Sequence, residues 1–507
     1  MFVKAIAAVV VLMMCLARTA CASDLWADAG QLREVRRCGD GVLYETDASH
    51  GTLLVARVRG THKEMGRQYG CLLGDKIISV MQVYTKASDP KDIKKTLIFR
   101  ACRNVWKRNE PHVPNEYKDE IVGIAQGANK AGFDVSPQLV ETGIALPNFS
   151  DMHDKKLMMS GLNPDDAKRL GMGAGFDFRT TCSSFAAWGG RTEGGRLFAT
   201  RDLDWESKTG VGQYGLVTVY EPAGDDGSPR NRYVTFGYPG VIGAIAGMSE
   251  KGITIGEIGA VNTVETQEGT PWTITMRRAL EEADNLEEAI AIIEKSKNTV
   301  GYNFVVGFGD PLRYGTPGFS PAAVAIEQNG EFTSVFRDDD PKERESAWID
   351  ADGNPVLKDG EQIKVGLPLK EAVYRADTSF DLRIRGTQTA SNGPARENSN
   401  GDPRESGAYS KRYAPNFYML DALAKGEAYS SDGREIFAAG APRLISAEET
   451  LRIMDAVSMK DSNILAVAYD ATSLEFWVAY ESMSDGNWKP ASDNKYSRFR
   501  LKDLFSE

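Results

Sequence analysis

Histidine is scarce in this chain and missing from most of it. The sequence has 507 residues and four histidines, His50, His62, His112 and His153, so residues 154–507 contain none. A nucleophilic serine or cysteine commonly relies on a nearby histidine as its base. That base is missing from the second part of the chain, and metal sites built on imidazole ligands are disfavoured there.

Other signatures are missing as well. The sequence contains no phosphate-binding GxxxxGK(S/T) loop and no His-Glu-x-x-His or Cys-x-x-Cys metal motif. Its 60 Lys and Arg residues are outnumbered by 71 Asp and Glu residues, which gives a net charge of −11. An acidic chain is a poor partner for nucleic acids and for anionic membranes. We expect no cofactor, no metal, no nucleic acid partner and no membrane span.

The N-terminus has the pattern of a secretory signal peptide. One positive charge precedes an apolar run over residues 5–16, and an Ala-x-Ala stretch follows. The run is too short to span a bilayer comfortably. We expect residues 1–22 to be removed after Ala22 and the protein to be exported, to a periplasm or out of the cell. Lipid attachment at Cys21 is a weaker alternative, because Arg18 stands where a small apolar residue is usual.

Cysteine is also scarce. Six are present, and four remain after removal of the signal peptide: Cys38, Cys71, Cys102 and Cys182. If Cys182 is reserved for chemistry, at most one disulfide forms among the other three. Spacing does not determine the pairing, and we expect Cys71–Cys102. Disulfides therefore do not build this fold.

The mature chain divides into two portions. Residues 23–181 begin with strand-like stretches at 41–46 and 52–60, continue with predicted helices over 62–81, 93–107 and 115–128, with Asn115 as a helix cap, and end in a polar, glycine-rich stretch at about 154–181. We interpret this last stretch as an exposed linker. An ordinary surface loop is the alternative.

Residues 182–507 are richer in strands. The expected strands lie at 183–189, 197–202, 215–220, 232–236, 253–258, 303–307, 322–327, 331–335, 464–469 and 474–480, and the expected helices at 272–283, 285–295, 416–424 and 447–456. Residues 337–411 are charged and turn-rich, and they are predicted to be loops that shape a ligand pocket. Strands followed by helices and further strands indicate an α+β fold with an antiparallel core.

One thiol stands at the start of the strand-rich portion. Cys182 follows Thr181 and opens an apolar stretch. A residue that begins a chain carries its own base, because an α-amino group titrates near ~7.7–8 and a free thiol near ~8.5. This chemistry requires a break between Thr181 and Cys182, which the thiol could make by attacking the Thr181 carbonyl. A buried structural thiol is the alternative.

Charged and amide side chains follow at positions that suit such a thiol. Arg201 and Asp204 lie on the next predicted strand, where an Arg favours the thiolate and an Asp stabilises a charged amine. In a regular strand these two side chains point to opposite faces, whereas Asp202 and Asp204 share one. Asn303 lies inside an apolar strand, a placement that strands disfavour, and it is a candidate oxyanion donor. An exposed ion pair and a turn residue are the alternatives.

Several motifs together carry a resemblance to a known family. They are residues 60–70, the helix at 117–128, the Thr181–Cys182 junction, residues 201–205 and the stretch 238–252. The chain resembles the isopenicillin N acyltransferase-like family (acyl-coenzyme A:6-aminopenicillanic acid acyltransferase) of N-terminal nucleophile cysteine hydrolases. More distantly it is similar to choloylglycine hydrolases, penicillin V acylases and acid ceramidase-type amidases.

The resemblance implies a fold and a set of roles. The fold is a four-layer αββα sandwich with a helical N-terminal prosegment. Cys182 is then the nucleophile, Arg201 and Asp204 hold the thiol and the new amine, Asn303 is the oxyanion amide and Arg412 supports the nucleophile. The sequence departs from the family pattern at Ser249, at Asp202 and over residues 391–393, each of which replaces or loosely matches the usual residues.

These observations predict an exported, self-processing enzyme. Residues 23–181 would remain bound, as the partner of a heterodimer, to a catalytic core over 182–507. The core would cleave the linear C–N bond of a small-molecule N-acyl amide, with water or an amine accepting the acyl group. Two alternatives stay open: a cysteine–histidine hydrolase that uses His62, His112 or His153 without cleavage, and a non-catalytic binding protein on an inactive hydrolase fold.

Overall fold

Two β-sheets stacked face to face form the centre of the molecule. The computed structural model describes residues 25–153, 181–349, 354–388, 409–484 and 486–505, so the predicted signal peptide and most of the predicted linker lie outside it. Across the first sheet the described strands run β1 (Trp26–Asp28), β23 (Tyr496–Arg500), β20 (Glu475–Tyr480), β19 (Asn463–Asp470), β6 (Phe198–Asp204), β5 (Thr181–Ala187) and β16 (Ala372–Arg375).

The second sheet is longer. Its described strands run β13 (Thr333–Phe336), β12 (Ala322–Gln328), β11 (Tyr302–Phe308), β10 (Ile253–Gly259), β9 (Ala246–Ser249), β8 (Tyr233–Gly237), β7 (Leu216–Pro222), β4 (Gly51–Gly60), β3 (Gly41–Ala48) and β2 (Arg33–Cys38). Most neighbouring pairs are antiparallel, as predicted, and the exceptions are β1 with β23 and β4 with β7. β5, β6 and β16 pack against β10, β11 and β12 of this sheet.

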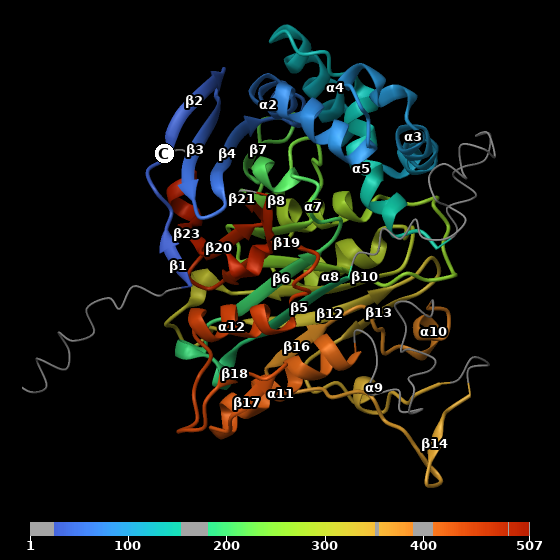
Figure 1. Ribbon diagram of the computed structural model, residues 1–507, viewed down its shortest axis with the longest axis vertical. Coiled ribbons are helices and arrows are strands. Elements are labelled where there is room, and N and C mark those ends of the chain that lie inside the picture. The colour runs from blue at the N-terminus through green and yellow to red at the C-terminus, as the bar shows by residue number, and fades with distance from the viewer. Residues whose placement is uncertain (1–24, 154–180, 350–353, 389–408, 485, 506–507) are drawn as a thin grey trace, which may run out of the picture.

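Helices cover both outer faces. α12 (Ala447–Val457) lies against β5, β6 and β19 with α11 (Ala414–Lys425) beside it, whereas α7 (Trp272–Glu282) lies against β9 and β10 and α8 (Leu286–Lys295) against β11 (Figure 1). The order of layers is therefore helix, sheet, sheet, helix. This confirms the predicted α+β class and the αββα sandwich.

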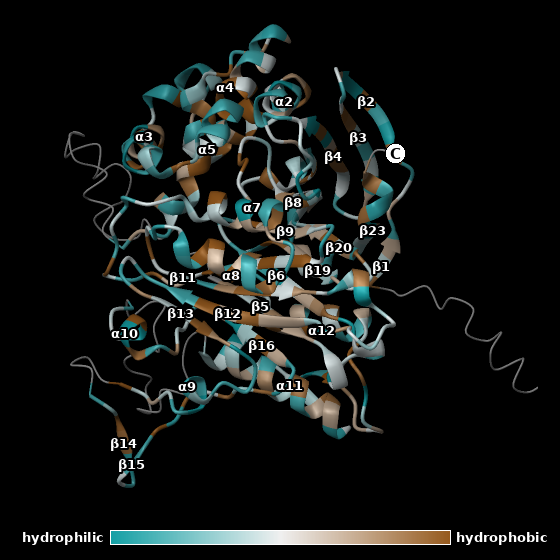
Figure 2. Cartoon of the chain, turned by 180° about the vertical axis from the view of Figure 1, so that it is seen from behind, coloured by the Kyte–Doolittle hydropathy of each residue, from teal (hydrophilic) through white to brown (hydrophobic). Residues whose placement is uncertain are grey.

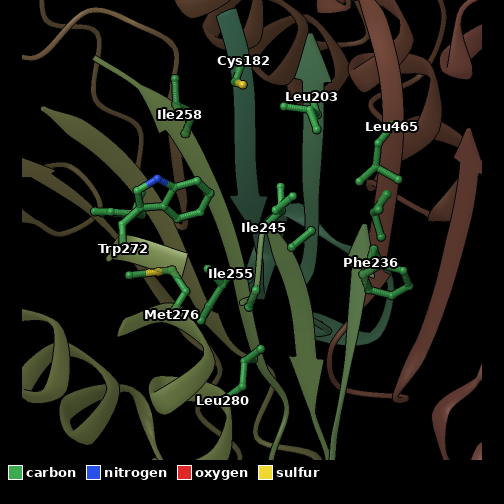
Figure 3. Packing of buried hydrophobic residues seen from close by; sticks show 14 of the residues in the cluster. Cys182, Leu203, Phe236, Ile245, Ile255, Ile258, Trp272, Met276, Leu280 and Leu465 are labelled. Carbon is green, nitrogen blue, oxygen red and sulfur yellow. The ribbon is translucent and has the colours of Figure 1, made fainter. Parts of the chain in front are cut away.

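Apolar stripes of the sequence explain this packing. Trp272, Met276 and Leu280 recur every four residues on α7, so they share one face of the helix, and all three are buried against the sheet. Figure 3 shows them beside Ile255 and Ile258 of β10. The polar faces of the outer helices and loops point to solvent, as the hydropathy colouring shows (Figure 2).

The N-terminal residues are part of both sheets. β1 pairs with β23, and β4 lies between β7 and β3 inside the second sheet. The chain then forms the helices α2 (His62–Thr85), α3 (Leu97–Asn109), α4 (Asn115–Lys130) and α5 (Pro137–Ser150), which gather at one end of the molecule in Figure 1. No described helix is both long and apolar enough to cross a bilayer.

The disulfide prediction is wrong. Cys38 at the end of β2 is bonded to Cys71 on α2, with their Cα atoms 6.1 Å apart, and Cys102 is a free thiol. The reason is geometric, because β2 lies beside α2 whereas the Cys102 side chain points from α3 into the buried apolar core. The bond ties the outer strand of the second sheet to the first long helix.

Three local features also differ from what the sequence led us to expect. Residues 337–411 are not all loop, since they contain β16, whose residues are buried beside β5. Asn115 does not cap α4, because Pro114 holds the cap position and Asn115 is the first helical residue. Helix α5 was not predicted, because Pro147 and several polar residues interrupt its apolar pattern.

Candidate active site

Cys182 lies near the start of β5, the strand between β6 and the edge strand β16 of the first sheet. It is the second residue of β5, opposite Leu203 on β6, and its side chain is 0% exposed. The thiol points into the apolar layer between the two sheets, near Leu203 and Ile258 in Figure 3. A thiol so placed is closed to solvent in this structure. Burial raises its pKa far above the usual range.

Arg201 is the charged neighbour of this thiol. It shares a face of β6 with Leu203, and the interaction of its guanidinium with the Cys182 thiol opposes the effect of burial on the thiol pKa. Its Nη2 donates to Glu257 Oε2 at 3.1 Å and its Nη1 to the carbonyl of Asp202 at 2.5 Å. The structure thus brings together Cys182 and Arg201, as predicted, and adds Glu257.

Glu257 was not singled out in the sequence. It is a buried residue of β10, and burial raises its pKa to about 8. When ionised it disfavours the thiolate of Cys182, because like charges repel. The signal for it was a carboxylate in the apolar strand 253–259, a position as unusual as that of Asn303.

Asp202 and Asp204 point to the other face of β6, as strand alternation predicts. Asp204 pairs with Arg412 and accepts a hydrogen bond from the backbone nitrogen of Met459 at 3.3 Å. Arg412 also lies 3.9 Å from Asp202 Oδ2. Arg412 comes from a short π-helical turn at Tyr409–Tyr413, 208 residues from Asp204 in the chain. The structure therefore joins Arg412 to the carboxylates of β6, the strand beside β5.

Asp202 itself is fully engaged. It accepts hydrogen bonds from Ser458 Oγ at 2.8 Å, from Asn463 Nδ2 at 2.5 Å and from Ser183 Oγ at 3.3 Å. These partners connect β5, β6, β19 and the end of α12 on one side of the sheet. The residue that replaces the family's usual asparagine thus acts here as the acceptor of a buried network.

Asn303 is buried on β11, but both of its amide hydrogens are in use. Its Nδ2 donates to the carbonyl of Ala376 at 2.8 Å and to that of Thr378 at 3.2 Å, and its Oδ1 accepts from Ser379 Oγ at 2.8 Å. An oxyanion role would require the amide to leave these carbonyls. In this structure Asn303 holds the segment that follows β16.

That segment carries a residue that the sequence analysis missed. Asp377 Oδ1 accepts the backbone N–H of Cys182 at 3.1 Å, and burial raises the pKa of the Asp377 carboxyl to about 7. Its position was hidden because residues 337–411 look like charged loops. The available signal was the short run Ala372–Arg375, in which Val and Tyr are typical of a strand.

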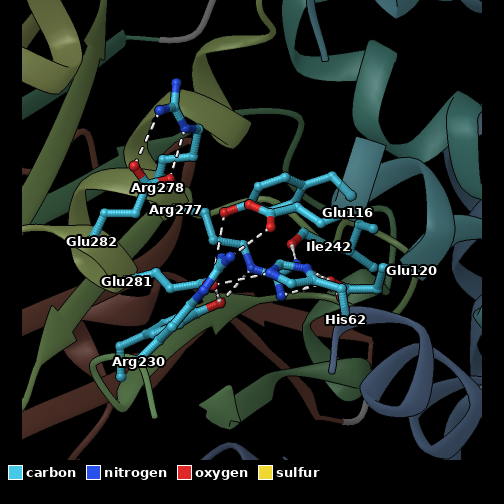
Figure 4. Close-up of polar contacts among 11 residues, drawn as sticks. His62, Glu116, Glu120, Arg230, Ile242, Arg277, Arg278, Glu281 and Glu282 are labelled. Atoms are coloured by element: carbon cyan, nitrogen blue, oxygen red, sulfur yellow. Dashed lines mark hydrogen bonds and ion pairs between the residues drawn. The ribbon is translucent and has the colours of Figure 1, made fainter. Parts of the chain in front are cut away.

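His62 binds carboxylates away from Cys182. His62 lies in the network of Figure 4, with Nδ1 2.7 Å from Glu120 and Nε2 3.0 Å from Glu281, and these carboxylates also bind Arg277 and Arg230. His62, Glu116 and Glu281 offer ligand atoms within 4.8 Å of one another, as a metal site would need. The two guanidinium groups already neutralise these carboxylates, so the arrangement fits ion pairs better than a metal.

Comparison with known proteins supports the resemblance. The order of layers is the αββα order that the sequence resemblance implies. Residues 191–310 match the model of the family described as acyl-coenzyme A:6-aminopenicillanic acid acyl-transferase, and this confirms the similarity to that family. The matched segment contains Arg201, Asp204, Glu257 and Asn303.

Two curated relatives cover part of the chain. An uncharacterized protein of Archaeoglobus fulgidus is 28% identical over 289 residues, which make up 55% of this chain and 45% of the relative. Protein dcd1B of Dictyostelium discoideum is 22% identical over 306 residues, or 60% of this chain and 55% of the relative. The chain therefore spans about half the length of the curated relatives it matches.

Three solved structures show partial overlap. The Caenorhabditis elegans N-acylethanolamine-hydrolyzing acid amidase ortholog has 10% identity and a TM-score of 0.35, covering 63% of this chain and 99% of its own. Penicillin V acylase of Agrobacterium tumefaciens has 11% identity and a TM-score of 0.29, and the match covers 59% of this chain and 83% of the acylase. A conjugated bile acid hydrolase mutant of Clostridium perfringens has 11% identity and a TM-score of 0.30, and the match covers 63% of this chain and 96% of the hydrolase. The layer order above rests on this chain's own strand pairing.

Proposed function

We propose that this protein is an exported amide hydrolase that activates itself by cutting the Thr181–Cys182 bond. Cys182 then carries both the nucleophilic thiol and, as an α-amine, its base. The substrate is a small-molecule N-acyl amide. Residues 23–181 stay bound to the core as the second subunit of a heterodimer. Export rests on the signal-like residues 1–22.

Activation uses the thiol once. The Cys182 sulfur attacks the Thr181 carbonyl carbon, and a thioester to Thr181 forms as the C–N bond between the two residues breaks. The proton of the thiol passes to the nitrogen of Cys182, which becomes a free amine. Water then hydrolyses the thioester, which leaves a carboxylate on Thr181 and returns the thiol. The position of Thr181 and Cys182 at the very start of β5, with residues 154–180 before them, supports this step.

Turnover uses the same two atoms. The α-amine takes the thiol proton while the sulfur bonds to the carbonyl carbon of the substrate, and it passes that proton to the nitrogen of the leaving amine. Water, deprotonated by the amine, then releases the acyl group as a carboxylic acid, and the proton returns to the sulfur. Arg201 stabilises the negative sulfur, since it already contacts the thiol in the uncut chain.

One observation supports the proposal most strongly. A single buried residue, Cys182, has an arginine at its thiol and a carboxylate at its backbone nitrogen, and no histidine among the described residues forms a hydrogen bond with it. A structural thiol needs neither partner. Cys102 shows the contrast, because its raised pKa results from burial alone, with no charged neighbour.

The test is intact mass and N-terminal sequencing of the mature protein. We expect two fragments, the larger beginning at Cys182, and an uncut chain in Cys182→Ala. Cys102→Ala is the matched control, since it removes the other buried free thiol, and it should be cut normally. An unbroken wild-type chain that begins near Ser23 would refute self-processing and favour the binding-protein alternative. The complete burial of Cys182 is consistent with that alternative.

A second assay distinguishes hydrolysis of the amide from transfer of its acyl group to an amine. We expect release of aminomethylcoumarin from N-acyl coumarinyl amides by the cut protein. Acyl-coenzyme A is not expected outside the cytoplasm, so the donor we propose is the amide. Formation of a new N-acyl product when a free amine is added, in place of the carboxylic acid, would favour transfer over hydrolysis.

A further inference from the structure

The Asp377 carboxylate accepts the hydrogen bond that a backbone carbonyl of β16 would accept if its pairing with β5 continued to Cys182. β16 and β5 pair antiparallel with Arg375 opposite Ser184, so the same register continued by two residues sets Asp377 opposite Cys182. The ladder ends at Arg375. The N–H of Cys182 then donates to the side chain of Asp377, whose Oδ1 lies 3.1 Å away. A side-chain acceptor therefore replaces a strand carbonyl at the proposed cleavage point.

The position of Asp377 is fixed from two sides. Asn303 binds the carbonyls on both sides of it, those of Ala376 and Thr378. Gln388 Nε2 donates to the carbonyl of Asp377 at 2.8 Å, and Gln388 Oε1 accepts the N–H of Ser379 at 2.9 Å. Asp377 is 1% exposed. Its carboxylate is thus held at the Cys182 nitrogen by the local backbone, independently of Cys182 itself.

The other nearby carboxylates have different partners. Asp204 pairs with Arg412 and accepts from Met459, and Asp202 is held by Ser458 and Asn463. Glu257 lies on the thiol side, against Arg201. Among the described residues, only Asp377 has a hydrogen bond to the nitrogen that the proposed cut would free.

We propose that Asp377 receives the new α-amino group of Cys182 and holds it beside the thiol, as the positioning residue of the base. This inference rests on the proposed function. Asp377 is the carboxyl whose oxygen already lies against the Cys182 nitrogen, so an ammonium group formed there and the Asp377 carboxylate would stabilise each other.

The role predicts a pH dependence with a definite sign. The pair of thiol and ammonium must lose one proton to become reactive, whichever atom loses it. A negative charge at Asp377 makes that loss harder and raises the pH at which it occurs, whereas Arg201 and Arg412 lower it. Asp377→Asn removes the charge and keeps an oxygen acceptor, so the reactive form should appear at lower pH.

The experiment measures alkylation of Cys182 by iodoacetamide against pH, read by mass, and therefore needs no substrate. We expect the midpoint of Asp377→Asn to fall by about one pH unit relative to the wild type. Asp377→Ala should be cut at least tenfold more slowly, because the acceptor is lost. Asp381→Asn is the matched control, since Asp381 lies in the same segment but binds Arg383, and its midpoint should not move.

Two failures are distinguishable by the same mass spectra. If the wild-type chain begins before Cys182, no amine is ever freed, and both the proposed function and this role are wrong. If the wild type is cut but Asp377→Asn alkylates with the wild-type midpoint, self-processing stands and only the role of Asp377 is refuted. A midpoint that moves equally in Asp381→Asn would also refute it, since any change of charge in the segment would then suffice.

Discussion

At the scale of single residues, the charge near Cys182 is finely balanced. Arg201 favours the thiolate, whereas Glu257, 3.1 Å from the same guanidinium, opposes it. Burial raises the pKa of Glu257 to about 8, so this carboxyl is mostly neutral at pH 7 and charged at pH 9. The reactivity of the thiol therefore depends on an arginine that stays charged and on one buried carboxyl that titrates in an accessible pH range.

This balance predicts the behaviour of Glu257→Gln. Below pH 8 the variant and the wild type should alkylate at similar rates. Glu257 is mostly protonated in the wild type, and an uncharged glutamine replaces it in the variant. Above pH 8 the variant should react up to about tenfold faster, because the opposing charge is missing. Rates of iodoacetamide labelling at pH 7 and 9 check this. Glu287→Gln, an exposed glutamate paired with Arg337, is the control, and equal rates for all three proteins at pH 9 would contradict the argument.

At the scale of elements, the sequence predicted the strands and helices of residues 182–300 apart from β9 (Ala246–Ser249), because their apolar periodicities are clear and turns separate them. It failed where tertiary contacts determine the outcome. β16 is four residues long within a charged region, and only its pairing with β5 makes it a strand. Asn303 was selected correctly as an unusual buried amide, but its partners at Ala376 and Thr378 are 73 and 75 residues away and leave no local signal.

The link between β11 and the end of β16 gives a stability prediction. Asn303→Ala removes three hydrogen bonds and leaves the buried carbonyls of Ala376 and Thr378 without this donor, so the free energy of unfolding should fall by about 3 kcal/mol. Urea denaturation measures it. Asn298→Ala, which loses similar amide contacts at the turn between β12 and β13, should leave Cys182 cutting unchanged. A fully cut Asn303→Ala protein with wild-type stability would show that Gln388 alone holds Asp377.

At the scale of the whole molecule, a buried ion network joins the two portions of the chain. His62 and Glu120 come from α2 and α4, and Arg277 and Glu281 come from α7, with Arg230 at its rim (Figure 4). Hydrogen bonds to the two glutamates outweigh the opposing effect of burial, which is the largest single influence, and raise the pKa of His62 to about 9. His62 is therefore a cation at neutral pH.

The stability that His62 contributes follows from that shift. A raised pKa in the folded state stabilises the protein fully below the unfolded value near 6.5, and the contribution disappears as pH rises through 9. His62→Gln should therefore lose about 3 kcal/mol at pH 6 and little at pH 10. Urea unfolding at both pH values measures the difference, with His112→Gln as the control on an exposed turn. An equal loss at both pH values would assign the effect to packing.

The long separation in sequence between the residues of the site would also determine when the proposed cut can occur during synthesis. Asp377 lies 195 residues after Cys182, and Arg412 lies 208 residues after Asp204. While the ribosome is still making this stretch, the nucleophile strand lacks its neighbour β16, its carboxylate and its second arginine. The proposed cut would therefore follow synthesis of these later residues, and in a chain truncated before Asp377 the Thr181–Cys182 bond should stay intact.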